Sequence, residues 1–334
     1  MTPCANGISP DERRRTTETR APVTTLSVVI PIYSSAASLP ELLAELARVL
    51  PGVADAFEVV MVDDASPDES WRVIEELSGL YPFVRGMQLM RNYGQHNALL
   101  CGIRAARYEL IVTMDDDLQH PPDQIPALLA ELDKGFDVVY GAPEAEQHGL
   151  LRDLASQMTK LALQGAMGVQ IARKVGAFRA FRTNLRDAFA NFHGPIVNID
   201  VLLTWGTTRF SAVDVRHHAR KYGQSNYTFR KLVRHALNMI TGFTVLPLQV
   251  ASLVGFLFFG FGMLVLIYVI GRYLLQGTPV EGFPFLASII ALFAGAQLFA
   301  LGIIGEYLAR MYLRSMDRPV YTVRTTLGAE EAES

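Results

Sequence analysis

Short apolar runs alternate with amphipathic stretches over the first half of the chain. The apolar runs are rich in β-branched residues and occupy positions 26–33, 57–64, 84–90, 109–117 and 137–142. Apolar residues recur at helical spacing between them, at 38–50, 68–80, 96–107 and 123–135. Ser38 can cap the first of these helices and Pro40 can occupy its first turn. Strands and helices that alternate in this way predict right-handed βαβ crossovers and an α/β fold with a mostly parallel, doubly wound sheet.

Two long apolar runs near the C-terminus, 250–271 and 283–305, contain no charged residue. Each exceeds the roughly 18–20 apolar residues that a helix needs to cross a bilayer. Buried core helices are the alternative, and two such runs in succession make it the weaker one. The runs therefore predict a two-helix transmembrane hairpin at 247–313.

The distribution of basic residues predicts the orientation of this hairpin. The connection between the spans contains one basic residue, Arg272. Basic residues are more frequent before the first span and after the second, at Arg216, Arg220, Lys221, Arg230, Lys231 and Arg234 and at Arg310, Arg314 and Arg318. The protein is expected in the inner membrane. By the positive-inside rule, both termini and the large N-terminal part are expected on its cytoplasmic side.

Composition excludes little by itself. A formal net charge of -3 gives no indication of nucleic-acid binding, which normally requires a strongly basic face. The two cysteines, Cys4 and Cys101, cannot support a disulfide framework. Cys101 lies in an apolar segment, where a buried free thiol is expected, so a reducing compartment is favoured for this part of the chain.

Aspartates end two of the predicted strands, as Asp63 and Asp64 and as Asp115, Asp116 and Asp117. Ligands of doubly wound sheets bind beyond the carboxyl ends of the strands. Crowded carboxylates repel one another, and a bound divalent cation removes that repulsion. Oxygen ligands alone favour Mg²⁺ or Mn²⁺ completed by substrate phosphates and water. A solvated acidic turn is the alternative. Strand alternation predicts that Asp115 and Asp117 share one side while Asp116 faces another.

A set of short motifs occurs in a fixed order along the chain: "VVIPIY", "VDDASPD", "RNYGQHNA", "DDDLQHPPDQIP", "GAFRAFR" and "YGQSNYTFRKL". With the two spans that follow, the set resembles the polyprenyl-phosphate glycosyltransferases of glycosyltransferase family 2. That group contains dolichol-phosphate mannose synthases, bactoprenol glucosyltransferases and undecaprenyl-phosphate 4-deoxy-4-formamido-L-arabinose transferases. The resemblance extends from residue 26 to about 319, and "RNYGQHNA" and the two-span tail look closest to the last branch.

The resemblance implies a GT-A catalytic domain and roles for individual residues. The implied donor-binding residues are Pro31, Tyr33, Asp63, Asp64, Arg91, Asp116 and Arg220. The implied metal ligands for Mg²⁺ or Mn²⁺ are Asp115, Asp117 and Gln119. The residues expected to bind the acceptor phosphate are Arg152, Arg179 and Arg182. Asp115, Asp117 and Arg179 are the residues expected to be catalytic.

The implied reaction moves one sugar from a UDP- or GDP-linked donor to polyprenyl phosphate. The resemblance also implies a homo-oligomer, which is a tetramer in some branches of the family. A lipid monophosphate is already an anion and needs positioning by arginines more than a general base. Direct displacement predicts inversion at the anomeric carbon. Ser35, Ala177 and Asn226 depart from residues common in the family. A processive polysaccharide synthase and a catalytically silent scaffold that binds lipid phosphate are the alternatives.

These expectations divide the chain into five parts. A disordered lead-in at 1–25, which has no apolar core like that of a signal peptide, precedes the catalytic domain at 26–225. A helix at about 149–169 is expected either on the membrane surface or as an ordinary domain helix, and a juxtamembrane amphipathic helix is expected at 226–246. The hairpin and a cytoplasmic tail at 314–334 follow.

Overall fold

The structure is a computed structural model that describes residues 24–143, 174–194, 196–218, 246–276 and 282–328. Its strands are β1 (Thr25–Ile32), β2 (Ala56–Asp63), β3 (Val84–Leu89), β4 (Leu110–Thr113), β5 (Val138–Pro143), β6 (Arg179–Arg182), β7 (Phe210–Val215) and β8 (Val323–Leu327). Its helices are α1 (Leu39–Val49), α2 (Ser70–Leu80), α3 (Gln95–Ala105), α4 (Ile125–Leu132), α7 (Ile199–Gly206), α9 (Leu246–Gln276) and α10 (Phe283–Ser315), with short 3-10 turns at Leu50–Gly52, Pro122–Gln124 and Thr183–Phe189. The predicted alternation of strands and helices is confirmed through β5.

One eight-stranded sheet forms the centre of the catalytic part, in the order β7-β5-β6-β4-β1-β2-β3-β8. The pairs β1–β2, β1–β4, β2–β3 and β5–β7 are parallel, whereas β6 and β8 run antiparallel to their neighbours. The expected mostly parallel sheet is therefore confirmed. It also contains a reversed strand, β6, between β4 and β5.

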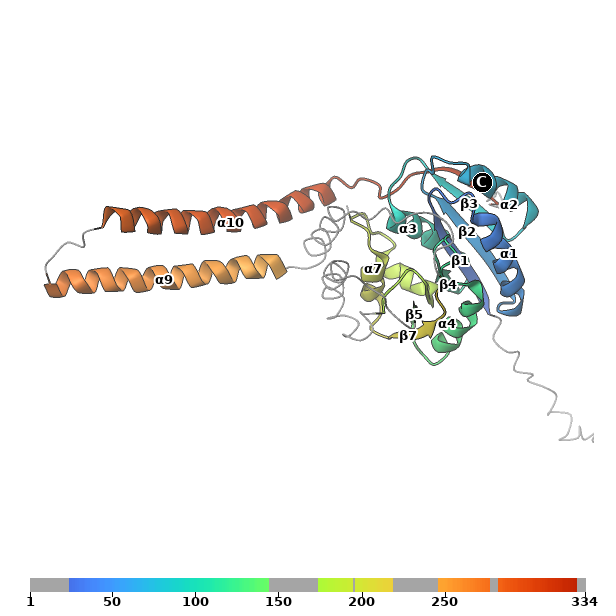
Figure 1. Cartoon of the computed structure of the whole chain (residues 1–334), viewed down its shortest axis with the longest axis horizontal. Helices are drawn as coiled ribbons and strands as arrows, with labels where there is room; N and C mark the ends of the chain where they lie inside the picture. Colours follow the sequence, from blue (N-terminus) through green and yellow to red (C-terminus); the bar gives the residue numbers. More distant parts are fainter. Residues whose placement is uncertain (1–23, 144–173, 195, 219–245, 277–281, 329–334) are drawn as a thin grey trace, which may run out of the picture.

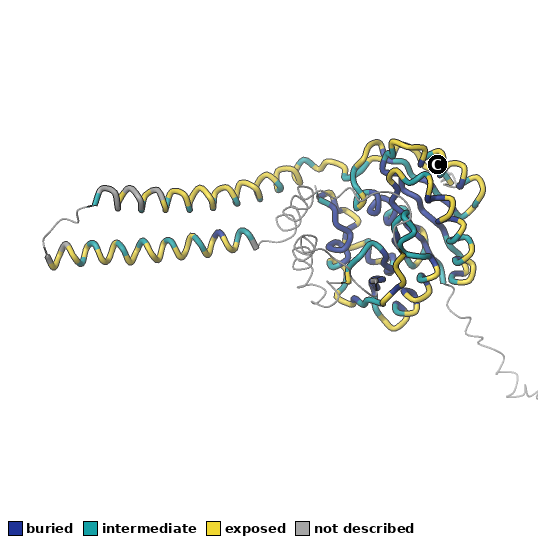
Figure 2. The backbone as a smooth tube through the Cα atoms, in the orientation of Figure 1, coloured by how far each residue is buried: buried dark blue, intermediate teal, exposed yellow. Residues whose placement is uncertain are grey.

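Both faces of the sheet are buried, as expected for strands that read as continuous apolar runs. One face packs on α3 and α7 through residues such as Leu100 and Leu202. The opposite face packs on α1, α2 and α4 through residues such as Leu42, Ile74 and Leu128. Figure 1 shows these layers, and Figure 2 shows the sheet as the most buried part of the chain.

The start of α1 differs in one detail from the expectation. Ser38 is the N-cap residue and Pro40 lies in the first turn, but the Ser38 side chain makes no capping bond. Its hydroxyl donates instead to the carbonyl of Ser35 at 3.0 Å. Ser38 is in the αR region rather than the extended region, so its side chain is not directed at the first N–H groups of the helix.

The tail at 314–334, in which no strand was expected, contributes β8. This strand pairs antiparallel with β3, with Gly86 opposite Leu327 and Leu89 opposite Val323. The catalytic sheet therefore includes residues from beyond the apolar helices. Figure 1 shows the chain returning from α10 to the far edge of the sheet.

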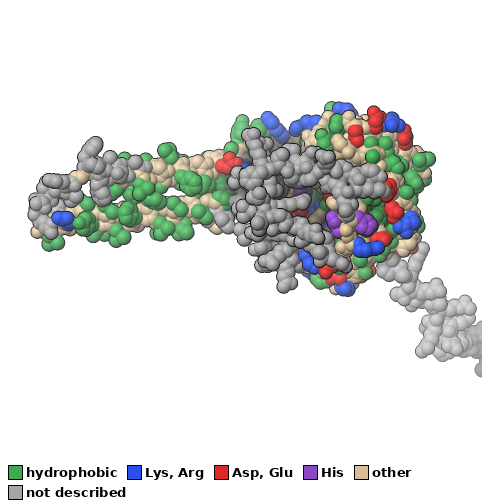
Figure 3. All heavy atoms as spheres, viewed as in Figure 1, with side chains coloured by type: hydrophobic (Ala, Val, Ile, Leu, Met, Phe, Trp, Pro, Cys, Tyr) green, Lys and Arg blue, Asp and Glu red, His purple; other side chains and the backbone are tan. Residues whose placement is uncertain are grey.

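Helices α9 and α10 lie side by side and are long and apolar enough to cross a membrane, with candidate spans at Pro247–Arg272 and Leu292–Ser315. Within those spans the apolar side chains are exposed rather than packed in a core, including Phe256 at 78% and Leu298 at 69%. Figure 3 shows hydrophobic side chains along both helices. Exposed apolar surface of this extent fits lipid better than water.

Several expectations lie outside the described residues. They are the disorder of residues 1–23, the helix at 149–169, the amphipathic helix at 226–246 except its last residue, and the roles of Arg152, Arg220 and Asn226.

Candidate active site

The carboxyl ends of β4, β1 and β2 meet at one edge of the sheet. The register places Ile32 opposite Asp63 and Val29 opposite Thr113, so the acidic segments after β2 and β4 flank the end of β1. Asp63, Asp64 and the Asp115–117 turn are thereby gathered at the edge where ligands of such sheets bind. The expectation that the two acidic strand ends share one edge is confirmed.

The Asp115–117 turn contacts three different neighbours. The Gln95 side chain donates to Asp115 at 2.7 Å, the backbone N–H of Tyr33 donates to Asp116 at 3.4 Å, and the backbone N–H of Gln119 donates to Asp117 at 3.1 Å. Because β4 already ends at Thr113, strand alternation does not govern these side chains. Strand alternation was therefore the wrong argument for the directions of these three side chains. Asp116 nevertheless points differently from Asp115, since Asp116 contacts the residue after β1 and Asp115 contacts α3.

The surroundings of Asp116 raise its pKa to about 6. Burial is the main cause, and the charge of Asp117 raises it further, while hydrogen bonds from Ser35 and the Tyr33 N–H lower it. The expected repulsion between crowded carboxylates is thus felt at this turn. Ser35 thus contributes one of the hydrogen bonds that lower the pKa of Asp116.

The donor set at the turn suits a hard divalent cation only in part. The side chains of Asp115, Asp117 and Gln119 offer oxygen atoms alone, which Mg²⁺ and Mn²⁺ prefer. Across the described residues, no three His, Cys, Asp or Glu side chains form a ready metal cage. Such a site fits an ion that is bound by one or two carboxylates and completed by substrate phosphates and water.

Asp64 is buried and accepts hydrogen bonds from the backbone N–H groups of Tyr93 and Gly94, both at 2.7 Å. Burial nevertheless raises the pKa of Asp64, since desolvation outweighs these two bonds. Asp64 therefore holds the segment between β3 and α3 against the end of β2.

Asp63 is also buried. Its two carboxylate oxygens accept hydrogen bonds from the Ser66 N–H at 3.1 Å and from the Gln88 side chain at 3.3 Å. These contacts connect the loop after β2 to β3, so Asp63 has a structural role. Its implied contact with the donor stays a prediction.

The remaining residues expected at the donor site lie around this edge. Pro31 is buried near the end of β1, and Tyr33 is 49% exposed just beyond it. Arg91 is exposed and its guanidinium lies over the Tyr93 ring, 4.4 Å from the centroid. An aromatic ring and an arginine at the rim offer contacts for a base and a phosphate.

Among the described residues, Arg179 has the largest fully buried side chain, at 1% exposure. Its Nε donates to the Thr113 hydroxyl at 2.9 Å, and its Nη1 forms an ion pair with Asp200 on α7. The Tyr140 hydroxyl donates to the same Asp200 oxygen at 3.1 Å, and Thr113 donates to the carbonyl of Ala177 at 2.8 Å. This network joins β4, β5, β6 and α7 directly below the Asp115–117 turn. Binding of the acceptor phosphate by Arg179 stays a prediction.

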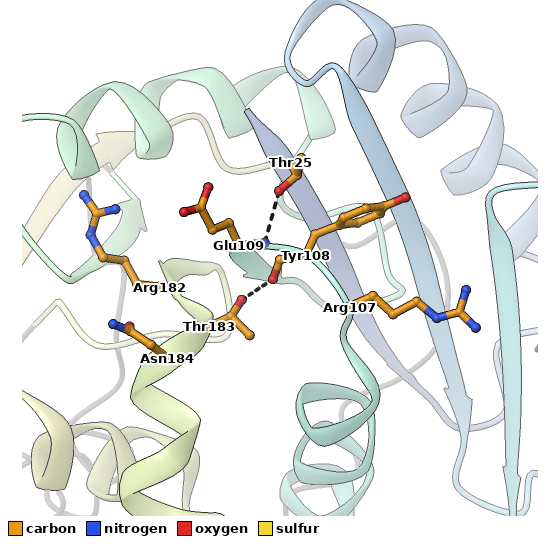
Figure 4. Close-up of a pocket in the computed structure, with 7 residues that line it drawn as sticks. All are labelled: Thr25, Arg107, Tyr108, Glu109, Arg182, Thr183 and Asn184. Carbon is orange, nitrogen blue, oxygen red and sulfur yellow. Dashed lines mark hydrogen bonds between the residues drawn. The ribbon is translucent and has the colours of Figure 1, made fainter. Parts of the chain in front are cut away.

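Arg182 lies at the other end of the sheet. It pairs with Leu110 at the start of β4, whereas Arg179 pairs with Thr113 at its end. Figure 4 shows Arg182 at a pocket of about 480 Å³ lined also by Thr25, Arg107, Tyr108, Glu109, Thr183 and Asn184. The two arginines of β6 therefore do not share one site, because three residues of extended chain separate them by about 10 Å.

Some residues of the site were not singled out from the sequence. Gln95 lies within the "RNYGQHNA" motif, which was the available signal. Asp200 and Thr113 carried no signal, since their pairing with Arg179 joins segments far apart in the chain.

The His120 ring, three residues after Asp117, stacks on Phe178 with ring centroids 5.3 Å apart and meets the His217 ring edge-on at 5.0 Å. Burial, and next the charge of His217, lowers the pKa of His120 to about 4, so its ring is neutral near pH 7. The backbone N–H of His218 donates to the carbonyl of Gln119 at 2.8 Å. The segment after β7 therefore contacts Gln119 and His120, which directly follow the Asp115–117 turn.

Comparison with known proteins identifies the family of the chain. Residues 27–190 match the family model described as glycosyl transferase family 2. The undecaprenyl-phosphate 4-deoxy-4-formamido-L-arabinose transferase of Shewanella sediminis is 35% identical over 91% of this chain and 93% of that protein, and its namesake from Proteus mirabilis is 33% identical over 92% and 95%. Among solved structures, glucosyl-3-phosphoglycerate synthase from Mycobacterium tuberculosis, in complex with Mn²⁺, UDP and glucosyl-3-phosphoglycerate, is 20% identical with a TM-score of 0.49 over 65% of this chain and 78% of that chain. The chain therefore belongs to glycosyltransferase family 2 and is a glycosyltransferase.

Proposed function

We propose that this enzyme transfers a single sugar from a nucleotide-sugar donor to polyprenyl phosphate at the cytoplasmic face of the inner membrane. The observation that carries the proposal is 35% identity, over 91% of this chain, to an undecaprenyl-phosphate 4-deoxy-4-formamido-L-arabinose transferase. The similarity spans both the sheet with its acidic edge and the two apolar helices. We propose 4-deoxy-4-formamido-L-arabinose as the sugar, with glucose and mannose as the competing candidates.

The donor would lie across the carboxyl ends of β1, β2 and β4. Tyr33 at the rim and the segment that Asp64 holds would border its base and ribose. Asp115, Asp117 and Gln119 would hold a Mg²⁺ or Mn²⁺ ion against the donor diphosphate. Such an ion stabilises the negative charge of the nucleoside diphosphate as it leaves.

The acceptor phosphate would attack the anomeric carbon directly, which inverts its configuration. The phosphate is an anion near neutral pH, so positioning and exclusion of water supply most of what the reaction needs. A phosphate approaching Arg179 would compete with Asp200 for the guanidinium. Arg182 is left out of this proposal because of its place at the opposite end of the sheet.

The two apolar helices would hold the catalytic part at the surface of the membrane that contains the lipid acceptor. A shared membrane raises the effective concentration of a lipid substrate around the site. The basic residues on the outer flanks of the spans support a cytoplasmic location for both termini.

Sugar transfer to undecaprenyl phosphate in proteoliposomes, with Mn²⁺ and a panel of UDP- and GDP-linked sugars, tests the proposal. We expect transfer by the wild type, loss with EDTA and with Asp117→Ala, and retention with the matched control Asp133→Ala, which changes an exposed aspartate at the end of α4. Equal transfer by the wild type and Asp117→Ala would contradict the proposed metal site. Nucleotide binding without transfer of any sugar would favour the silent scaffold, and products longer than one sugar would favour a processive synthase. The anomeric configuration of the product, measured by NMR, tests inversion.

A further inference from the structure

The segment that follows α10 contacts the loop between β3 and α3. We call residues 318–327 the C-terminal strap and residues 90–94 the β3–α3 loop. The N–H of Met90 donates to the carbonyl of Thr322 at 2.9 Å, and the Arg324 guanidinium donates to the carbonyl of Met90 at 3.3 Å. Both backbone groups of Met90 are thus held by the strap, at the point where pairing between β3 and β8 becomes irregular.

The strap is itself fixed to the domain core. Val320, Tyr321 and Val323 pack against the cluster beneath α3. The Tyr321 ring is half-buried with the Arg104 guanidinium 5.8 Å from its centroid, and its hydroxyl contacts Arg104 and Cys101. At the end of the strap, the Leu327 side chain packs closely on Gly86: a Cβ added to Gly86 would lie 3.1 Å from Leu327 Cδ1. The strap is therefore a packed part of the domain.

The inner side of the β3–α3 loop holds the carboxylates at the proposed donor site. The Tyr93 and Gly94 N–H groups donate to Asp64, and Gln95, the next residue, donates to Asp115. Gly94 adopts a φ of 96°, which favours glycine and lets the loop turn into α3. The β3–α3 loop thus contacts the strap on one side and Asp64 on the other, and Gln95 at the start of α3 extends the contact to Asp115.

We propose that the C-terminal strap is a positioning element of the donor site, acting through the β3–α3 loop on Asp64 and Asp115. The inference rests on the proposed function in taking that edge as the donor site. Since α10 ends at Ser315, only seven residues, 316–322, join it to β8. Seven residues span at most about 25 Å, so the strap also holds the donor edge close to the end of α10.

Amide hydrogen exchange tests the mechanical part of the proposal without any ligand. In the full-length protein, Arg324→Ala and the double variant Tyr321→Ala/Arg324→Ala should raise the exchange rates of the Tyr93 and Gly94 amides about three- to tenfold, the effect of losing one net hydrogen bond. Thr325→Ala is the matched control, since the Thr325 side chain is exposed on the same strand. Wild-type exchange at both amides in the double variant would overturn the proposal.

Kinetics and binding test the functional part. The KM for the sugar nucleotide and the Kd for UDP or GDP with Mn²⁺ should rise about three- to tenfold in the variants, while the KM for undecaprenyl phosphate and the melting temperature of Arg324→Ala stay at wild-type values. A purely structural role for the strap would lower the melting temperature and leave the donor KM unchanged, which would overturn the proposal. If the wild type neither binds a nucleotide nor transfers sugar, the proposed function fails, and the exchange rates alone decide whether the strap holds the loop.

Discussion

Replacement of Asp200 by alanine should strongly destabilise the catalytic domain. Asp200 accepts from the Arg179 guanidinium and from the Tyr140 hydroxyl, and these two side chains lie on β6 and β5. The exposed fractions of the paired side chains are 1% for Arg179 and 11% for Asp200. Asp200→Ala would leave a buried guanidinium with only the Thr113 hydroxyl as its described partner.

The expected cost is that of an unpaired charge in a protein interior. Removing one partner of a buried ion pair costs about 3–5 kcal/mol. For a domain of this size, each kcal/mol lowers the melting temperature by about 2–4 °C, so a loss of roughly 6–20 °C is expected. Asp200→Asn keeps an oxygen acceptor and should lose less. Arg179→Met combined with Asp200→Ala removes both charges and should recover most of the loss.

Tryptophan fluorescence during heating is a suitable assay, because both tryptophans, Trp71 and Trp205, lie in the catalytic part. Trp205 is on α7, the helix that carries Asp200, and packs edge-on against Phe192 at 5.5 Å. A melting temperature for Asp200→Ala within about 2 °C of the wild type would refute the reasoning. So would a double variant that melts lower than Asp200→Ala, since a buried charge could then not be the cause.

Two further predictions concern packing and pH. Gly102→Ala should destabilise the domain by about 1–3 kcal/mol in denaturant titrations, because the added Cβ would clash with β1. The control Gly79→Ala has open space around it and should stabilise the domain by about 0.5–1 kcal/mol. Equal effects of the two substitutions would contradict the packing of α3 on β1. The Arg209 guanidinium, hydrogen-bonded to Asp137, lowers the pKa of that carboxyl, so the pair stabilises the fold above the unfolded pKa and loses this contribution as pH falls through the folded value. Asp137→Asn should therefore lose less stability than the wild type between about pH 5 and pH 2, and parallel acid-unfolding curves would count against this pair.

Local periodicity in the sequence determined much of the fold. The strands and helices from β1 to β5 lie within a few residues of the predicted ranges, and the acidic turns fall at one sheet edge as expected. Such features depend on the alternation of apolar residues and on chain direction, which neighbouring residues specify together. The two apolar helices follow from length and composition in the same way.

The end of each strand was a weaker inference. β4 ends at Thr113, two residues before the acidic turn, so the faces of Asp115, Asp116 and Asp117 are set by contacts with Gln95, Tyr33 and the turn itself. Similarly, Ser38 has the position of a cap without making the capping bond. Backbone conformation at such ends depends on neighbouring elements as well as on residue type.

By itself, then, the sequence determined the order of the elements from β1 to β5, the edge that gathers the carboxylates and the apolar helices. Only the tertiary structure decided that β6 enters the sheet in reverse, which places Arg179 rather than Arg182 at the carboxyl end of β4. It also decided that β8 returns to the edge of β3. Only the fold, likewise, brings Asp200 to Arg179 and Thr322 to Met90. The physical reason is that strand order and ion pairing depend on contacts between residues far apart along the chain, which no local pattern records.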